Sequence, residues 1–218
     1  MLIFKKVYRT FQVKQGIVEA MKNVSFEINS GEFLVINGPS GCGKTTLLLV
    51  AGSLLHPTSG NVSIDGKNPY SMNNEERNKL RACTIGFVFQ QFHLIPYLSV
   101  RENILSPALA TGEKTNNYRV EELVNHFGLT DRMDHYPHQM SMGEKQRTAL
   151  ARALFNNPKI ILADEPTGNL DEDNAHIIFS YLKEYTRHGG SVLLVSHDRE
   201  AAQYGSRVLS MKSGELLY

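Results

Sequence analysis

The chain has 218 residues, of which 41% are hydrophobic and 21% are charged, so it can form one compact domain and is not a disordered chain. Its 23 Lys and Arg residues against 22 Asp and Glu residues give a formal net charge of +1, and a chain this close to neutral predicts no nucleic-acid partner. Two cysteines are too few for a disulfide framework, which indicates a reducing compartment. The apolar runs are shorter than the about 20 residues of a membrane-spanning helix.

The first part of the chain is rich in predicted strands and contains one Gly-rich loop. Alternating or continuous short apolar runs, bounded by turn residues, are typical of strands. Such strands are predicted over residues 24–28, 33–36, 61–64 and 85–89. A helix is predicted over 44–51, directly after the Gly-rich loop, and Gly52 would end it. The charge-rich stretch 73–81 is expected to form a solvated helix face.

The strand signal disappears from about residue 92 to residue 153 and then returns. Helices are predicted in this interval over residues 101–108, 119–127 and 143–156, with a polar linker at 111–117. The later elements are expected as strand 160–163, helix 174–187, strand 192–196, helix 199–204 and a hairpin of 207–211 with 215–218. Strands that alternate with helices predict a largely parallel sheet with helices on both faces.

Residues 38–45 read Gly-Pro-Ser-Gly-Cys-Gly-Lys-Thr and match the phosphate-binding pattern G-x-x-x-x-G-K-[ST], between a predicted strand and a predicted helix. Backbone N–H groups of such a loop surround phosphate oxygens, and Lys44 adds a charge that reaches the β and γ phosphates. The Thr45 hydroxyl is a hard oxygen ligand for Mg²⁺. Cys42 could be a thiol of low pKa at a helix start, although a small residue at a variable position is the simpler interpretation. The predicted nucleotide contacts here are Gly38, Pro39, Ser40, Gly41, Cys42, Gly43, Lys44, Thr45 and Thr46.

The predicted strand over 160–163 is followed directly by two carboxylates, Asp164 and Glu165. The carboxyl end of a parallel strand lies at the same edge of the sheet as the phosphate loop. Asp164 would then hold Mg²⁺, and Glu165 would orient and polarise the water that attacks the γ phosphate. Without the loop, the pair would be interpreted as an exposed acidic turn.

Five further segments resemble motifs of the ATP-binding cassette (ABC) proteins. The octapeptide 140–147, Met-Ser-Met-Gly-Glu-Lys-Gln-Arg, resembles the family's signature sequence. The others are Gln90, which resembles the Q-loop, residues 168–171, which resemble the D-loop, His197, which resembles the switch histidine, and Phe11, which resembles the aromatic residue that stacks on adenine. These segments follow the family's order from Phe11 to His197, so the resemblance covers nearly the whole chain.

The resemblance implies a P-loop NTPase fold of the α/β class in a single ABC ATPase domain, residues 1–218. In this fold a mostly parallel core sheet is joined by an N-terminal antiparallel β subdomain and a helical insertion. The core and β subdomain would span about 1–91 and 154–218, and the helical subdomain about 92–153. The implied activity is ATP hydrolysis with ATP and Mg²⁺, coupled to transport through a separate transmembrane permease. The implied location is peripheral, at the cytoplasmic face of the inner membrane.

The resemblance also implies roles for residues outside the phosphate loop. Ser141 and Glu144 read as a capping box that opens a helix, and a capped helix start followed by Gly143 can receive a phosphate. In the family this segment contacts the nucleotide of the other subunit, so a homodimer is expected and one chain holds half a site. The remaining implied roles are Mg²⁺ coordination by Gln90, γ-phosphate sensing by His197, a subunit contact at Asp171 and adenine stacking by Phe11, with Tyr8 as an alternative.

The chain departs from the family's usual L-S-G-G-Q signature, because Met140, Met142 and Glu144 replace Leu, Gly and Gln. Met142 places a flexible side chain where glycine is usual and can alter the contact with the partner. Residues 86–96 and 163–171 most resemble the macrolide-exporter and lipoprotein-release subgroup, which leaves the cargo open. The apolar residues of 92–98 would suit a groove for the membrane subunit, or ordinary packing of the insertion.

Three other functions are weighed against the transporter motor. A cassette that regulates a cell-division or other non-transport complex is compatible with the same motifs. Cassettes of DNA repair carry long coiled coils, and those of translation carry two cassettes in one chain, and this sequence shows neither. A small GTPase is disfavoured, because no N-K-x-D guanine motif is present in the sequence. A small P-loop kinase is disfavoured as well, because it would not need Ser141, Gly143 and His197 in this arrangement.

Overall fold

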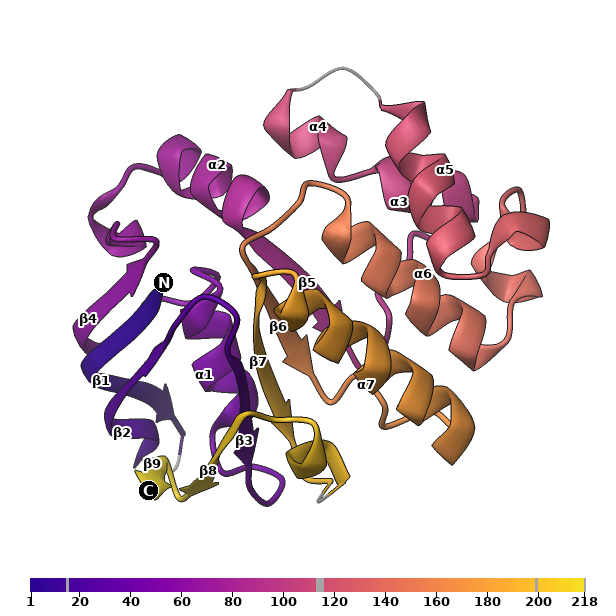
Figure 1. Cartoon of the computed structure of the whole chain (residues 1–218). Coiled ribbons are helices and arrows are strands. Elements are labelled where there is room, and N and C mark those ends of the chain that lie inside the picture. The colour runs from indigo at the N-terminus through magenta and orange to yellow at the C-terminus, as the bar shows by residue number, and fades with distance from the viewer. Residues whose placement is uncertain (15, 113–115, 199, 218) are drawn as a thin grey trace.

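The computed structural model describes residues 1–14, 16–112, 116–198 and 200–217 and contains two sheets (Figure 1). A three-stranded antiparallel sheet has the order β2-β1-β4, made by β1 (Leu2–Val13), β2 (Gly16–Ile28) and β4 (Ser59–Ile64). A six-stranded sheet has the order β5-β6-β7-β3-β8-β9 and is parallel up to β8. Its strands are β3 (Phe33–Asn37), β5 (Ile85–Phe89), β6 (Ile160–Asp164), β7 (Ser191–Ser196), β8 (Arg207–Lys212) and β9 (Glu215–Leu217).

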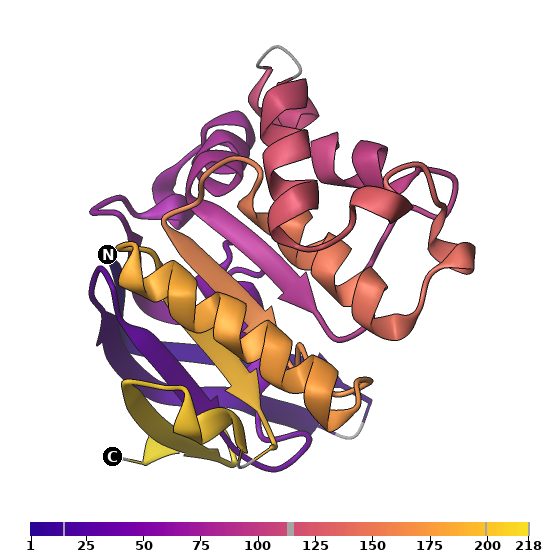
Figure 2. The ribbon, with the colours of Figure 1, turned by 45° about the vertical axis from the view of Figure 1, so that its right-hand side comes forward.

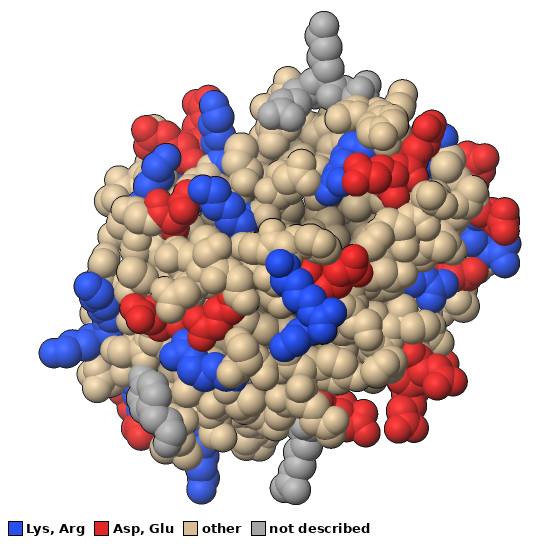
Figure 3. Space-filling model, viewed as in Figure 1, with Lys and Arg blue, Asp and Glu red and all other residues tan. Residues whose placement is uncertain are grey.

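The helices are α1 (Lys44–Ala51), α2 (Asn74–Thr84), α3 (Val100–Leu105), α4 (Ala108–Thr111), α5 (Asn117–His126), α6 (Met142–Leu154) and α7 (Glu172–Arg187). Short 3₁₀ helices cover Pro69–Ser71, Thr130–Arg132, Pro137–Gln139 and Glu200–Gln203. Among the described residues, no helix has both the length and the apolar character that a membrane crossing requires. On the face shown in Figure 3, acidic and basic side chains are interspersed.

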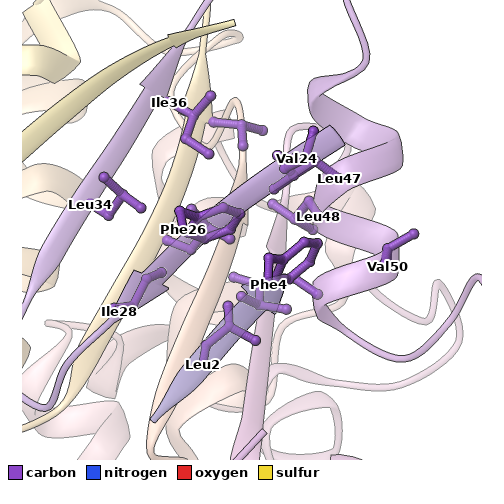
Figure 4. Close-up of a cluster of buried hydrophobic side chains, with 14 of the residues drawn as sticks. Leu2, Phe4, Val24, Phe26, Ile28, Leu34, Ile36, Leu47, Leu48 and Val50 are labelled. Carbon is purple, nitrogen blue, oxygen red and sulfur yellow. The ribbon is translucent and has the colours of Figure 1, made fainter. Parts of the chain in front are cut away.

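The parallel sheet is buried on both faces, and alternate residues of its strands enter two different cores. Leu34 and Ile36 of β3 face α1 and the antiparallel sheet, where they pack with Phe4, Phe26 and Leu47 (Figure 4). Phe33 and Val35 face the opposite side, where α6 and α7 cover the strands (Figure 2). Helices therefore lie on both faces as predicted, and the antiparallel sheet shares one face with α1.

The strand β1 is the element that the sequence does not predict. Its pairing with β2 shifts register between Phe4 and Thr10, so the regular alternation that marks a strand is interrupted. Phe11, expected ahead of the first strands, lies within β1 itself.

Two predicted helices also differ from the observed ones. The helix predicted over 101–108 is broken into α3 and α4, because Pro107 cannot continue an α-helix. The helix predicted over 199–204 is the short 3₁₀ turn Glu200–Gln203, and Arg199 lies outside the described residues. Residues 113–115 of the predicted linker and Tyr218 of the predicted hairpin also lie outside them.

The parallel pairing brings four strand ends to one edge of the sheet. In register, Asn37 pairs with Ser196 and Asp164 pairs with both Phe89 and Val195. The loops that follow β3, β5, β6 and β7 therefore start side by side, which is where ligands bind in such sheets. Residues 92–153 carry α3, α4, α5 and most of α6, and their assignment as a separate subdomain stays a prediction.

Candidate functional site

The phosphate loop connects β3 to α1, and its glycines are required by its backbone. Gly41 and Gly43 have φ angles of 77° and 112°, in the left-handed region that disfavours other residues. A Cβ atom on Gly43 would lie 2.2 Å from the carbonyl oxygen of Ala20. The first N–H groups of a helix have no partner within it, and the described residues supply no side-chain cap for α1. Such an open helix start can bind an anion.

A cavity of about 560 Å³ opens at this loop, within the size range of small-molecule sites. It brings together the predicted residues Ser40, Gly41, Cys42, Gly43, Lys44, Thr45, Thr46, Gln90, Asp164 and Glu165. Residues that the sequence did not indicate also line it, namely Val18, Glu19, Ala20, Lys22, Ser213 and Gly214. They come from β2 and from the turn after β8. The two segments are joined by a backbone hydrogen bond of 2.8 Å, which the Lys22 N–H donates to the Gly214 carbonyl.

Lys44 is buried at the start of α1, with 5% of its side chain exposed. Its ammonium group donates hydrogen bonds to the carbonyl oxygens of Gly38 at 2.7 Å and Pro39 at 3.0 Å. The Lys44 Nζ atom also lies 3.8 Å from Glu165 Oε1. The loop thus holds the cation inside the same cavity as the acidic strand end, where it can meet a phosphate.

Glu165 is held between two strand ends. Its N–H donates to the Val195 carbonyl at 2.9 Å, and its Oε2 atom lies 2.9 Å from His197 Nδ1. Its φ angle of 45° is unusual for a residue other than glycine, and such strain clusters at functional sites. His197 is half exposed and lines a neighbouring cavity that also contains Glu165 and Gly168.

Asp164 ends β6 beside the phosphate loop. Burial is the largest influence on this carboxyl group and raises its pKa; the charge of Glu165 adds to this rise. A hydrogen bond with the Thr45 side chain and the charge of Lys44 oppose it. Asp164, Thr45 and Gln90 thus bring carboxylate, hydroxyl and amide oxygens to one cavity, and this donor set fits Mg²⁺.

Gln90, directly after β5, packs against the loop that follows β6. Its carbonyl oxygen accepts a hydrogen bond of 3.0 Å from the Asn169 side chain. A Cβ atom on Gly168 would lie 2.6 Å from Gln90 Nε2, so glycine is needed for this approach. The two loops therefore hold each other in place.

A second cluster forms where α6 and α7 begin. Ser141 caps α6, its Oγ accepting from the Glu144 N–H while the Glu144 carboxylate accepts from the Ser141 N–H at 2.8 Å. Burial opposes ionisation of Glu144, but hydrogen bonds from Ser141 and Arg132 outweigh it and hold its pKa below the usual value. The predicted capping box is present.

The second cluster is joined to α7 through Asn174. A Cβ atom on Gly143 would lie 2.3 Å from the Asn174 side-chain oxygen. Asp171 caps α7 by accepting from the Asn174 N–H at 2.8 Å, and these hydrogen bonds lower the pKa of Asp171. Asn174 has no signal in the sequence, because only the packing of α7 on α6 reveals its contact.

Most of the predicted residues fall into two groups, the lining of the phosphate-loop cavity and the second cluster. Gly38 and Pro39 do not line the cavity but accept hydrogen bonds from Lys44, and His197 lines the neighbouring cavity. The described residues that line the phosphate-loop cavity do not include Ser141, Gly143, Glu144 or Asp171. Phe11 belongs to neither group; it pairs with Val18 across the antiparallel sheet, and the Arg9 guanidinium lies 4.4 Å from its ring centroid. The roles of Phe11, of the second cluster and of the cavity residues stay predictions.

Comparison with known proteins decides the family. A family model described as ABC transporter matches residues 21–168. An uncharacterised ABC transporter ATP-binding protein of Methanocaldococcus jannaschii is 42% identical over 100% of this chain and 98% of its own length. The chain belongs to the ABC transporter family.

Other relatives of this ABC cassette differ in size and in the function that their names give. A putative hemin import ATP-binding protein of Staphylococcus haemolyticus is 40% identical, and this chain covers 98% of its length. A macrolide export ATP-binding/permease protein of Chlorobium luteolum is 43% identical over 95% of this chain, but the chain spans only 32% of that relative. The structural similarity extends to a dimeric ATP-binding cassette of M. jannaschii in a post-hydrolysis state with ADP and Pi. Its TM-score is 0.93 at 40% identity, covering 100% of this chain and 97% of that one.

These comparisons confirm the family, the P-loop fold with its antiparallel N-terminal sheet, and the ATPase activity that the sequence predicts. The cassette binds and hydrolyses ATP as a subunit of the transporter class. The similarity to a macrolide export protein supports the predicted subgroup.

Proposed function

We propose that this cassette is a Mg²⁺-dependent ATPase that closes as a homodimer around ATP and powers a separate transmembrane permease. The observation that carries the proposal is the separation of its two phosphate-binding elements. The Lys44 loop shares a cavity with Asp164 and Glu165, whereas the Ser141 end of α6 lies outside that cavity. In this proposal one chain would supply two complementary halves of a site, and a second copy would join them.

The phosphate loop would bind the triphosphate through charge and backbone donors. The uncapped start of α1 directs N–H groups and the positive end of the helix dipole at the phosphates. Lys44 would exchange the carbonyls of Gly38 and Pro39 for phosphate oxygens. Phe11 would stack on adenine, since its cross-strand neighbour Val18 lines the same cavity. The small side chain of Cys42, itself buried, would fit this loop as a packing residue.

Hydrolysis would depend on the residues at the ends of β6 and β7. Glu165 would accept a proton from the attacking water, and His197 would orient Glu165 through their 2.9 Å contact and sense the γ phosphate. Thr45, Gln90 and Asp164 would hold Mg²⁺, which neutralises the charge that develops on the phosphates. A cation beside Asp164 would favour the ionised form that burial disfavours.

The second half of the site would come from the partner's α6. Because Ser141 Oγ accepts the Glu144 N–H, its own hydroxyl hydrogen is free to be donated to a γ phosphate. Gly143 and Glu144 would shape the same contact, and Asp171 would organise the subunit contact through Asn174. Met142, 49% exposed at the start of α6, would lie in this interface.

We also propose a membrane partner and a location, and membership of the transporter family supports both. We place the cassette at the cytoplasmic face of the inner membrane as a peripheral subunit, with residues 92–153 as a helical subdomain between core segments 1–91 and 154–218. The relatives' names refer to hemin import and to macrolide export, so a cargo is not proposed.

The direct test is ATP hydrolysis measured over a range of protein concentrations, with light scattering on the same samples. A site composed of two chains predicts a rate that rises faster than linearly at low concentration, and loss of the rate when Mg²⁺ is chelated. A rate strictly proportional to concentration from a monomer would overturn the dimeric site. Full activity in excess chelator would overturn the Mg²⁺ site.

A further inference from the structure

The turn that follows Gln90 has an unusual backbone. Phe92 and His93 are consecutive residues other than glycine, and both have left-handed φ angles, 58° and 46°. Such residues persist only where the surrounding structure holds them. Gln90, which lines the phosphate-loop cavity, lies two residues before Phe92, within the turn that the Phe92 N–H closes on the Phe89 carbonyl.

One side chain of α6 donates hydrogen bonds to both residues of this turn that have left-handed φ angles. The guanidinium of Arg152 donates from Nη1 to the His93 carbonyl at 2.6 Å and from Nη2 to the Phe92 carbonyl at 2.7 Å. Burial lowers the pKa of Arg152, although an arginine stays charged at physiological pH. The planar guanidinium gives each carbonyl its own nitrogen in a fixed fork, whereas a lysine would have to serve both carbonyls from one nitrogen at the end of a flexible chain.

Arg152 also lies on the helix that carries the second half of the proposed site. α6 runs from Met142 to Leu154, with Ser141 as its cap and Arg152 in its last turn. Thr148, Ala149 and Leu150 are buried, so the middle of the helix is held by its own packing and does not depend on Arg152. In the proposed dimer the N-terminal end of α6 would contact the partner's nucleotide, while Arg152 in its last turn bonds to the turn that follows Gln90.

We propose that Arg152 is a positioning residue that couples Gln90 in the nucleotide cavity to Ser141 at the far end of α6. The inference rests on the proposed function, since it assigns a consequence to nucleotide contacts at both ends. When Gln90 shifts on nucleotide binding, the clamped turn transmits the shift to α6 and sets the orientation of Ser141.

A simpler role for Arg152 is a basic charge near the C-terminal end of α6, which stabilises any helix. Arg152→Lys separates the two roles, because lysine keeps the charge but not the fixed fork of two nitrogens. Arg152→Met removes both. The matched controls are Arg187→Lys and Arg187→Met, at an exposed basic residue in the last turn of α7.

The experiment measures ATP affinity, kcat, KM and amide hydrogen exchange on the full chain. In both Arg152 variants we expect ATP affinity within about twofold of the parent, since the phosphate loop is untouched. We expect kcat to fall about tenfold, the effect of losing one or more hydrogen bonds to a charged group. Exchange of the amides in 91–98 should become faster, and the Arg187 variants should match the parent in every measurement.

Parental kcat and parental exchange in Arg152→Lys would overturn the proposal and leave only the helix-end charge. If Arg152→Met fails to fold, Arg152→Lys with its melting temperature decides the question alone. A parent chain that hydrolyses no ATP would contradict the proposed function instead. The exchange of 91–98 in the variants would then still support or overturn the clamp by itself.

Discussion

Two helices of this cassette begin at proposed phosphate contacts, and they begin in opposite ways. α1 starts after Gly43, and the described residues provide no side-chain cap for it. α6 starts after Ser141 with a complete capping box, in which Glu144 returns a hydrogen bond to the cap. The first helix is left open at its N-terminus, and the second is closed by its own side chains.

This difference explains why the two ends would bind phosphate by different groups and at different times. The open start of α1 offers backbone N–H groups and has most to gain from a bound anion. The closed start of α6 is stable without a ligand and offers the Ser141 hydroxyl hydrogen instead. We therefore infer that α1 binds nucleotide first and that α6 of the partner completes the site.

The largest effect is expected from a substitution that removes the hydrolysis step and leaves the N-terminal ends of α1 and α6 unchanged. Glu165→Gln removes the general base, so turnover should fall about 10²–10⁴-fold while ATP still binds. Phosphate release and a direct ATP titration measure the two quantities. A variant that hydrolyses ATP at the parental rate would remove Glu165 from the mechanism.

The next largest effect is expected from a substitution that changes only the open N-terminal end of α1. Lys44→Ala removes the buried ammonium of the phosphate loop, and ATP affinity should fall about 10–100-fold, as for the loss of charged hydrogen bonds. Isothermal titration of the free chain measures this loss without a dimer. Equal affinity in the variant and the parent would contradict the loop's role.

A smaller effect is expected from a substitution that changes only the capped N-terminal end of α6. Ser141→Ala should lower the free energy of unfolding by about 1 kcal/mol through loss of the cap. It should also lower turnover while leaving ATP affinity of the free chain unchanged. Asn73→Ala is the matched control, because Asn73 forms an equivalent capping box on the exposed start of α2. If both variants lose equal stability and neither loses turnover, Ser141 is only a cap.

The smallest expected effect concerns the stability that the free protein loses by burying a carboxylate beside the open end of α1. Burial raises the pKa of Asp164, so the folded state disfavours its charged form. This penalty is absent at low pH and develops as the pH rises above the ordinary carboxyl value of 3.8. Asp164→Asn should therefore melt on the order of 1–2 °C higher at pH 7, with no gain near pH 3. An equal shift at both pH values would contradict the electrostatic cause.

Sequence alone predicts the parts of the fold that depend on neighbouring residues. The bounds of α1 follow from the flanking Gly43 and Gly52, and the phosphate loop follows from its spacing. The parallel order then brings Glu165 and His197 to the loop, because their strands end at one edge of the sheet.

The remainder depends on contacts between distant segments, which no local pattern reveals. Val18 can line the phosphate-loop cavity only when the antiparallel sheet packs beside the loop. β1 itself cannot be recognised in the sequence because of its register shifts. The hydrogen bond from Arg152 to Phe92 joins residues 60 positions apart. Asn174 likewise acquires its place only when α7 packs on α6.

The central claim is that ATP is held between the Lys44 loop of one chain and the Ser141 helix end of its mate. Sedimentation of the Glu165→Gln chain with MgATP tests it most directly. The account predicts a dimer with two ATP molecules, and a monomer that still binds ATP when Ser141→Arg is added. A Glu165→Gln chain that remains monomeric at saturating ATP, or a dimer that is insensitive to Ser141→Arg, would contradict it.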